Sequence, residues 1–254
     1  MKKSLIALAT ASAVFSGIVQ AEEEQLPQPM QMIVETGAAE VVKTFDTERG
    51  DIQGYVIKQA NGNHTIVYGL DDYAFAGVLL NEKGENLTNR YAAEHIPEPD
   101  LTGVAEKIMS SEHLLTEGPE GAPELYVFTD PNCPYCAKFF EMSRSYVEQG
   151  KVQIHWIPVG FLKSSSKQIS AAIIQGGIDV MAKAKRAGRG EQKPMAEVTN
   201  EIGRALVMHQ KYMGEAGISG TPGFLFKVDG KWEKQGGLPP ESKFEKILTQ
   251  MRGG

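Results

Sequence analysis

The two cysteines of this 254-residue chain lie three positions apart, in the run Cys133-Pro134-Tyr135-Cys136. The preceding segment Glu124–Thr129 has the β-branched and aromatic residues of a buried strand. The following segment predicts a helix that starts at Pro134 and ends before Gly150. Two thiols at a strand-to-helix turn are typical of a redox site, in which a disulfide between Cys133 and Cys136 forms and breaks.

The two thiols are expected to have different roles. Cys133 would lie at the helix N-terminus, where unpaired N–H groups and the helix dipole favour a thiolate and lower the thiol pKa to about 3.5–7.5. We therefore expect Cys133 to be the attacking nucleophile and the more buried Cys136 to be the resolving thiol. Pro134 suits the first helical turn, and Tyr135 is expected to shape the surface and tune the thiolate.

The N-terminus has the pattern of a cleavable bacterial signal peptide over residues 1–21. Lys2 and Lys3 precede the apolar stretch Leu5–Ile18, and Ala21 ends a small-residue cleavage site. That stretch is shorter than the about 20 apolar residues that span a bilayer. We therefore expect export to the periplasm and no membrane insertion.

The charge balance and cysteine content limit the partners and cofactors that the chain is expected to bind. The chain has 26 basic and 32 acidic residues, and loss of the leader with its two lysines would take the net charge from −6 to −8. An acidic balance argues against nucleic acid as a partner. The loop closed by a Cys133–Cys136 disulfide is too short to add much stability, so its use is expected to be chemical. Without a second cysteine pair a zinc site is not expected, and no metal or organic cofactor is implied.

The rest of the chain divides into an N-terminal domain over 22–95, a linker helix within 96–121 and a second domain over 122–254. The N-terminal domain is predicted to be α+β, with a core that is marginal alone and an edge strand that invites pairing with a second copy. Its predicted elements are the helix Gln25–Thr36 and the strands Ala39–Phe45, Ile52–Lys58, His64–Tyr68 and Tyr73–Leu80.

The second domain is predicted to be α/β with a helical insert at about 165–213, and the linker helix is expected to begin after Pro99. The basic run Lys183–Arg189 within the insert is interpreted as a solvated helix end. The remaining predicted elements are the strand Val152–Ile157, the helices Lys167–Gln175, Asp179–Lys185 and Met195–Tyr212, the hairpin of Gly223–Val228 with Lys231–Gln235, and the helix Glu241–Met251.

This order of elements resembles the thioredoxin fold, in which a cis-proline faces the C-x-x-C run. Thr221-Pro222 stands at the matching point, directly before the strand Gly223–Val228. Cis X–Pro bonds are uncommon, at about 5–6%, but the small residues before Thr221 and the order of elements favour one here. The Thr221 backbone would then pair with an extended substrate segment, and its hydroxyl with a cysteine sulfur.

The mature chain resembles the DsbC/DsbG family of periplasmic thiol:disulfide interchange proteins. The resemblance rests on Val42-Lys43-Thr44-Phe45-Asp46, Asn81-Glu82-Lys83-Gly84-Glu85-Asn86-Leu87, Asp130-Pro131, the cysteine run, Thr221-Pro222 and Gly237-Leu238-Pro239. It implies a homodimer through cystatin-like N-terminal modules, thioredoxin domains facing a cleft, and cysteines kept reduced by the membrane electron donor DsbD. It also implies action on misformed disulfides or sulfenylated cysteines of periplasmic substrate proteins.

One position departs from thioredoxins, which carry a buried acid six residues before the first cysteine, where this chain has Val127. We expect slower deprotonation of Cys136 and longer-lived mixed disulfides. Three other functions remain open: a net dithiol oxidase, which differs in redox poise and not in motif; a chaperone-like holdase; and a metal carrier. The five histidines are scattered in sequence, so a cysteine hydrolase lacks support.

Overall fold

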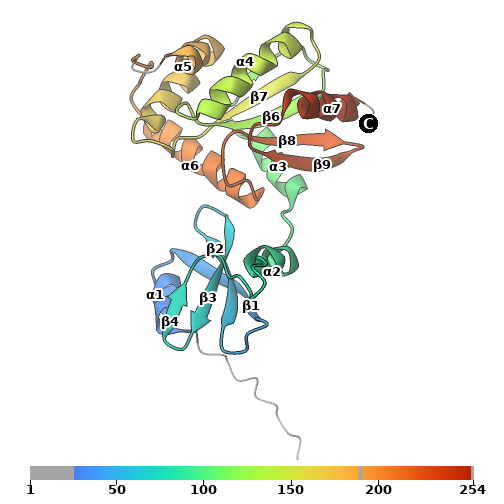
Figure 1. Ribbon diagram of the computed structural model, residues 1–254. Coiled ribbons are helices and arrows are strands. Elements are labelled where there is room, and N and C mark those ends of the chain that lie inside the picture. The colour runs from blue at the N-terminus through green and yellow to red at the C-terminus, as the bar shows by residue number, and fades with distance from the viewer. Residues whose placement is uncertain (1–25, 189–190, 253–254) are drawn as a thin grey trace, which may run out of the picture.

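The computed structural model describes residues 26–188 and 191–252, so the predicted signal peptide lies outside the described residues. Figure 1 shows an N-terminal lobe built on one β-sheet and a C-terminal lobe built on another, joined by an extended segment near residues 96–100. The two sheets share no strand. Among the described helices, none is long and apolar enough to cross a membrane.

The N-terminal lobe is the predicted α+β module. Its antiparallel sheet has the order β1-β2-β3-β4 and carries a helix on each face. Met30 of α1 packs against Tyr55 on one face, and Tyr91 of α2 packs against Val56 on the other. The elements are α1 (Gln28–Glu35), β1 (Ala39–Asp46), β2 (Gln53–Gln59), β3 (His64–Leu70), β4 (Tyr73–Phe75) and α2 (Leu87–His95).

The C-terminal lobe is built on a mixed sheet in the order β5-β7-β6-β8-β9, in which β6 and β7 are parallel and the other pairs antiparallel. This is the predicted thioredoxin topology, with the helical insert between β7 and β8. The elements are α3 (Leu101–Met109), β5 (Leu115–Glu117), β6 (Glu124–Thr129), α4 (Pro134–Glu148), β7 (Gln153–Pro158), α5 (Ser166–Arg186), α6 (Asn200–Glu215), β8 (Gly223–Val228), β9 (Lys231–Gly236) and α7 (Glu241–Arg252).

Helices cover both faces of this sheet because β6 is apolar on both sides. Leu125 and Val127 point into a core formed with α4, α5 and α7, whereas Tyr126 and Phe128 point into a second core formed with α3 and α6. A strand buried on both faces holds its C-terminal end rigidly. The cysteine run follows directly from that end, at Thr129.

Predicted and observed elements differ at a few points. The strand predicted over Tyr73–Leu80 ends at Phe75, because the Leu79 N–H donates to the Thr88 hydroxyl instead of to a strand. The span α5 contains the two predicted helices, Lys167–Gln175 and Asp179–Lys185, on either side of a kink at Gly177, whose φ of 70° and ψ of −160° are not helical. Helix α6 begins five residues after the predicted Met195, where the Thr199 side chain accepts a hydrogen bond from the Ile202 N–H. Helix α2 was not predicted as a separate element.

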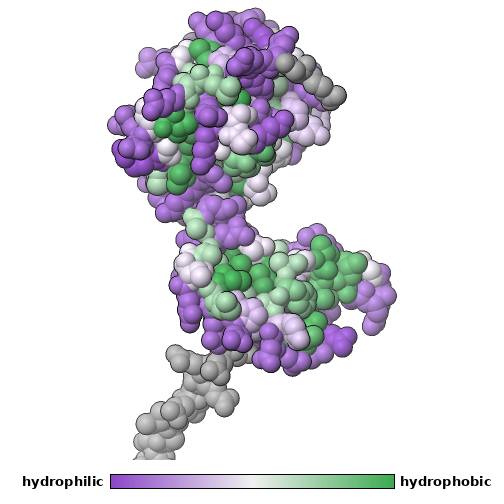
Figure 2. All heavy atoms as spheres, turned by 90° about the vertical axis from the view of Figure 1, so that its left-hand side faces the viewer, coloured by the Kyte–Doolittle hydropathy of each residue, from purple (hydrophilic) through white to green (hydrophobic). Residues whose placement is uncertain are grey.

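Apolar side chains are exposed on the N-terminal lobe. Figure 2 shows hydrophobic residues gathered on the side of this lobe that carries α1 and β4. Strand β4 is an edge strand, so the backbone groups along one of its sides have no neighbouring strand. The exposed large hydrophobic residues of this lobe include Met32, Val34, Val42, Tyr73, Phe75, Val78 and Leu80.

Candidate active site

Cys133 is the N-cap residue of α4, as the sequence predicts. Its backbone N–H donates to the Asp130 carbonyl (3.1 Å), and its Sγ accepts a hydrogen bond from the Cys136 backbone N–H (3.3 Å). The sulfur thus takes one of the N–H groups that a helix N-terminus leaves unpaired. Both cysteines are free thiols in this structure, and both are buried.

The segment before β8 lies against the cysteine pair. The Thr221–Pro222 peptide bond is cis, and the Thr221 carbonyl oxygen lies 3.1 Å from Cys133 Sγ. The Thr221 hydroxyl is buried and has no hydrogen-bond partner of good geometry among the described residues. Segments about 90 residues apart in sequence therefore meet at Cys133 Sγ, and the cis bond predicted before β8 is present.

The environments of the two thiols push their pKa values apart. A hydrogen bond with the Cys136 thiol lowers the pKa of Cys133 to about 5; burial opposes this shift, and Thr221 and the N–H groups of Cys136 and Tyr135 assist it. Burial, followed by the hydrogen bond with Cys133, raises the pKa of Cys136. These shifts favour a thiolate at Cys133 and a thiol at Cys136 at neutral pH, and the roles of nucleophile and resolving thiol stay predictions.

The two residues between the cysteines face solvent. Pro134 and Tyr135 are both exposed, and Tyr135 keeps 55% of its surface accessible. The Lys138 ammonium lies 5.6 Å from the centre of the Tyr135 ring, a cation–π distance. These exposed side chains border the sulfur and are available for contact with a substrate.

A buried carboxylate, that of Asp130, organises the loops around the cysteines. It accepts hydrogen bonds from the backbone N–H groups of Asn132 (2.9 Å), Phe161 (2.9 Å) and Leu162 (3.1 Å), and from the Ser166 hydroxyl (2.9 Å). Asp130 is fully buried. Four donors satisfy the charge that burial would otherwise make costly, so Asp130 links the C-terminal end of β6 to the loop after β7.

A buried lysine also lies at this site, in contrast to the solvated helix end predicted around it. Lys185 of α5 is only 5% exposed, and its Nζ donates to Thr129 Oγ1 (2.7 Å) and to the Asp130 carbonyl oxygen (2.9 Å). Its neighbours Lys183 and Arg186 are exposed as expected. The helical period places Lys185 on the inner face of α5, a register that charge composition alone does not reveal.

A cavity of about 540 Å³ opens beside Cys133, between the start of α4 and the helical insert. Its lining is basic in part, because Lys163, Lys185 and Lys193 all contribute to it. Burial lowers the pKa of Lys193, and the nearby charge of Lys163 acts in the same direction. The cavity therefore borders both Cys133 and the buried lysine.

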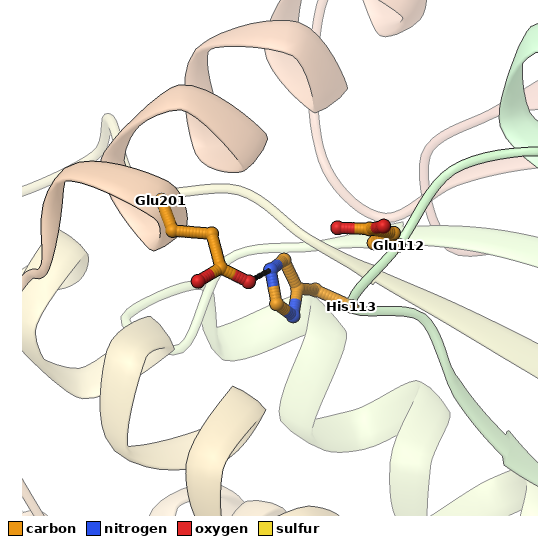
Figure 3. Close-up of side chains that lie close together, drawn as sticks. All are labelled: Glu112, His113 and Glu201. Atoms are coloured by element: carbon orange, nitrogen blue, oxygen red, sulfur yellow. Dashed lines mark ion pairs between the residues drawn. The ribbon is translucent and has the colours of Figure 1, made fainter.

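A second group of titratable side chains lies at the start of α6 (Figure 3). Glu112, His113 and Glu201 bring ligand-type atoms within 4.8 Å of one another. Glu201 Oε1 and His113 Nε2 lie 3.0 Å apart, as the dashed line shows. This pair connects the segment after α3 to α6, and the group contains neither cysteine.

Comparison with known proteins agrees with this geometry. Residues 114–252 match the Thioredoxin-like domain family. The whole chain is 31% identical to the thiol:disulfide interchange protein DsbG of Escherichia coli (strain K12), over 98% of this chain and 99% of that protein. It is 28% identical to DsbG of Pseudomonas aeruginosa, over 98% of both chains.

A solved structure shows the same fold for the C-terminal lobe. The catalytic domain of Proteus mirabilis ScsC superposes with a TM-score of 0.52 at 19% identity, covering 61% of this chain and 97% of that domain. The thioredoxin fold predicted from the order of elements is thus confirmed.

Proposed function

The chain belongs to the DsbG family of thiol:disulfide interchange proteins, and we propose that Cys133 performs the exchange through a mixed disulfide that Cys136 resolves. The protein is thus a thiol–disulfide oxidoreductase with a thioredoxin-like domain. The observation that carries the mechanism is the position of Cys133 Sγ, which caps α4, accepts the Cys136 N–H and has a pKa of about 5.

The exchange has two steps. The Cys133 thiolate attacks one sulfur of a substrate disulfide; the substrate S–S bond breaks, and the other substrate sulfur leaves with the electron pair as a thiolate. Cys136 then attacks Cys133 Sγ, which releases the substrate thiolate and leaves the Cys133–Cys136 disulfide. If a different cysteine of the substrate attacks the substrate sulfur of the mixed disulfide first, a new substrate disulfide forms, the Cys133 thiolate leaves and the enzyme stays reduced, which is isomerisation.

The same thiolate also suits a sulfenylated cysteine. Cys133 attacks the sulfenic sulfur, the S–O bond breaks, and the oxygen leaves as water after protonation. Cys136 then resolves the resulting mixed disulfide as before. Each such turnover oxidises the cysteine pair, so a dithiol reductant must restore it, and the family resemblance supports the membrane donor DsbD for this role.

Substrate binding is proposed to use the backbone before β8. The Thr221 carbonyl oxygen lies 3.1 Å from Cys133 Sγ, and the Thr221 hydroxyl is buried and has no partner of good geometry among the described residues. An extended substrate segment pairing there would place its cysteine at Cys133, in the manner of an added strand. The exposed Pro134 and Tyr135 would form the other wall of this substrate site.

We further propose that the N-terminal lobe joins two copies of the chain. Strand β4 lies at the edge of its sheet, and the side chains of Tyr73, Phe75 and Val78 are exposed. Both features support a second copy of the chain as the partner that covers this face of the lobe. The proposed division is dimerisation over 22–95, a linker over 96–121 and catalysis over 122–254. Residues 1–21 would be removed on export to the periplasm.

Two experiments test this function. A Cys136→Ser variant should accumulate mixed disulfides with periplasmic proteins, visible on non-reducing gels and lost on reduction, whereas a Cys133→Ser variant should form none. Purified reduced protein should also restore activity to an enzyme with scrambled disulfides. If the protein oxidises reduced substrates but leaves scrambled ones unchanged, it is a net oxidase.

A holdase function makes a different prediction. A chaperone that does not depend on its cysteines would still suppress the aggregation of an unfolding protein after both are replaced. The Cys133→Ser, Cys136→Ser double variant would then be as effective as the parent protein. We expect that double variant to lose disulfide exchange entirely. Retention of any restored activity on the scrambled enzyme would contradict the proposed mechanism.

A further inference from the structure

The resolving thiol presents a chemical problem. Cys136 must be a thiolate when it attacks the mixed disulfide, yet it is fully buried and burial raises its pKa. Val127 occupies the β6 position at which thioredoxins carry an acid, and it packs in an apolar core. The base or charge that activates Cys136 must come from another element.

Lys185 of α5 lines the same cavity as Cys133 and is hydrogen-bonded to the segment that leads into the cysteine run. Its Nζ donates to the Asp130 carbonyl oxygen, the atom that also accepts the Cys133 backbone N–H. One carbonyl group thus joins the lysine to the nucleophile's backbone. The second hydrogen bond, to Thr129 Oγ1, fixes the ammonium at the C-terminal end of β6.

The charge of this lysine is not balanced by a direct ion pair. Lys185 pairs with no carboxylate among the residues that the structure describes, and its two hydrogen bonds go to neutral oxygens. The nearest acid, Asp130, directs its carboxylate to four other donors. A buried ammonium needs a compensating negative charge.

The groups that act on Lys185 identify that negative charge. Burial lowers the pKa of Lys185; Cys136, Cys133 and Asp130 raise it, in that order, and Lys193 lowers it. Lys185 in turn lowers the pKa of Cys136, whereas burial and the neighbouring Cys133 raise it. The two active-site sulfurs, when ionised, and Asp130 are therefore the groups whose negative charge can balance this ammonium.

We propose that Lys185 is a positioning residue for the resolution step, acting by stabilising the Cys136 thiolate. Once Cys133 is tied up in a mixed disulfide, its sulfur carries no charge, and Cys136 becomes the sulfur that can balance the ammonium. The Cys136 proton passes to solvent water; the cavity beside Cys133 is lined by Lys185 but not by Cys136 itself, which is fully buried. The Cys136 thiolate then forms the S–S bond to Cys133 as the substrate thiolate leaves.

The inference rests on the proposed exchange mechanism and is tested by timing its two steps separately. Reduced protein is mixed with a small peptide disulfide and quenched in acid over time, and the mixed disulfide and the Cys133–Cys136 disulfide are counted by mass spectrometry. Lys185→Met removes the charge but keeps the bulk. Lys185→Gln also keeps hydrogen bonding, Lys185→Arg keeps the charge, and Lys183→Met is the exposed control on the same helix.

We expect Lys185→Met and Lys185→Gln to slow resolution about ten-fold at neutral pH, the effect of raising the Cys136 pKa by about one unit. In these two variants the resolution rate should reach its maximum only at a higher pH than in the parent protein. The rate at which Cys133 attacks the peptide disulfide should change much less. Lys185→Arg should restore most of the rate and pH profile, and Lys183→Met should match the parent.

Unchanged resolution in both uncharged variants would overturn the proposal. An equal fall in attack and resolution would also overturn it, because that result indicates a general loss of the site. Failure of the proposed exchange mechanism is distinguishable, since the parent protein would then form no mixed disulfide at all. Alkylation of Cys133 at an unchanged rate confirms that each variant keeps a folded active site.

Discussion

The reactivity of Cys133 depends on hydrogen bonds that favour its thiolate. Because the pKa falls to about 5, well below the ordinary value of about 8.5, the thiolate is present at neutral pH and is lost as the pH falls through 5. We expect the absorbance of the reduced protein at 240 nm, and its rate of alkylation, to titrate with a midpoint near that value. A Cys133→Ser variant should lose the transition, and a midpoint near 8.5 would show that the site does not activate this sulfur.

The Thr221 hydroxyl is the second residue-scale determinant. It is buried without a partner of good geometry, and Thr221 contributes to the low pKa of Cys133. Replacing it in Thr221→Val keeps the side-chain shape and removes the hydroxyl, so we expect the Cys133 pKa to rise. The 240 nm titration measures the shift; Thr249→Val, on the exposed face of α7, should leave the midpoint unchanged. An unaltered midpoint in Thr221→Val would exclude a role for the hydroxyl.

The sequence predicts some site residues and misses others for a physical reason. The spacing of Cys133 and Cys136 and the order of elements before β8 are local signals, and the two segments do meet. Asp130 belongs to a motif of the family resemblance, but neither its structural role nor that of Lys185 has a local signal, because both depend on a hydrogen bond that joins positions 55 residues apart in the chain. Charge and position along α5 predicted a solvated lysine, and only the tertiary packing buries it.

At the scale of elements, Asp130 connects β6 to the loop after β7. The Asp130→Asn variant replaces one accepting oxygen with a donor, so at least one of the N–H groups of Asn132, Phe161 and Leu162 would be left without its partner. A buried unpaired group costs about 1–3 kcal/mol. We expect the free energy of unfolding, measured in urea, to fall by that amount. Asp72→Asn, in an exposed turn, is the control, and equal stability of the two variants would contradict this role.

The elements themselves were largely predictable where hydrophobic pattern and turn residues agree. Strands β6 and β8 have the predicted bounds, and α4 and α7 end within one residue of theirs. The strand predicted beyond Phe75 is replaced by side-chain hydrogen bonding to Thr88, which apolar alternation does not encode. The short β5 exists only because it pairs with β7, a contact that no local pattern specifies.

At the scale of the whole molecule, the two lobes touch where the β2–β3 turn meets the end of α6. A Cβ atom at Gly214 would lie 2.1 Å from the Asn61 carbonyl oxygen, so a side chain there cannot fit without movement. We expect Gly214→Val to separate the lobes and increase the radius of gyration in small-angle X-ray scattering. A Cβ atom at Gly203, also in α6, would make only an ordinary 3.7 Å contact. Gly203→Val should therefore leave the radius of gyration unchanged. Identical scattering from both variants would mean that this contact does not hold the lobes.

We propose that the cysteine pair works in its reduced form, with Cys133 as the attacking thiolate. The redox state of the pair in intact cells tests it most directly. Cells are quenched in acid, free thiols are alkylated with a mass tag, and the shift of the protein is read on a gel. We expect Cys133 and Cys136 to be mostly reduced, as an isomerase or reductase with a dedicated electron donor requires. A mostly oxidised pair would contradict this role and identify a net oxidase on the same fold.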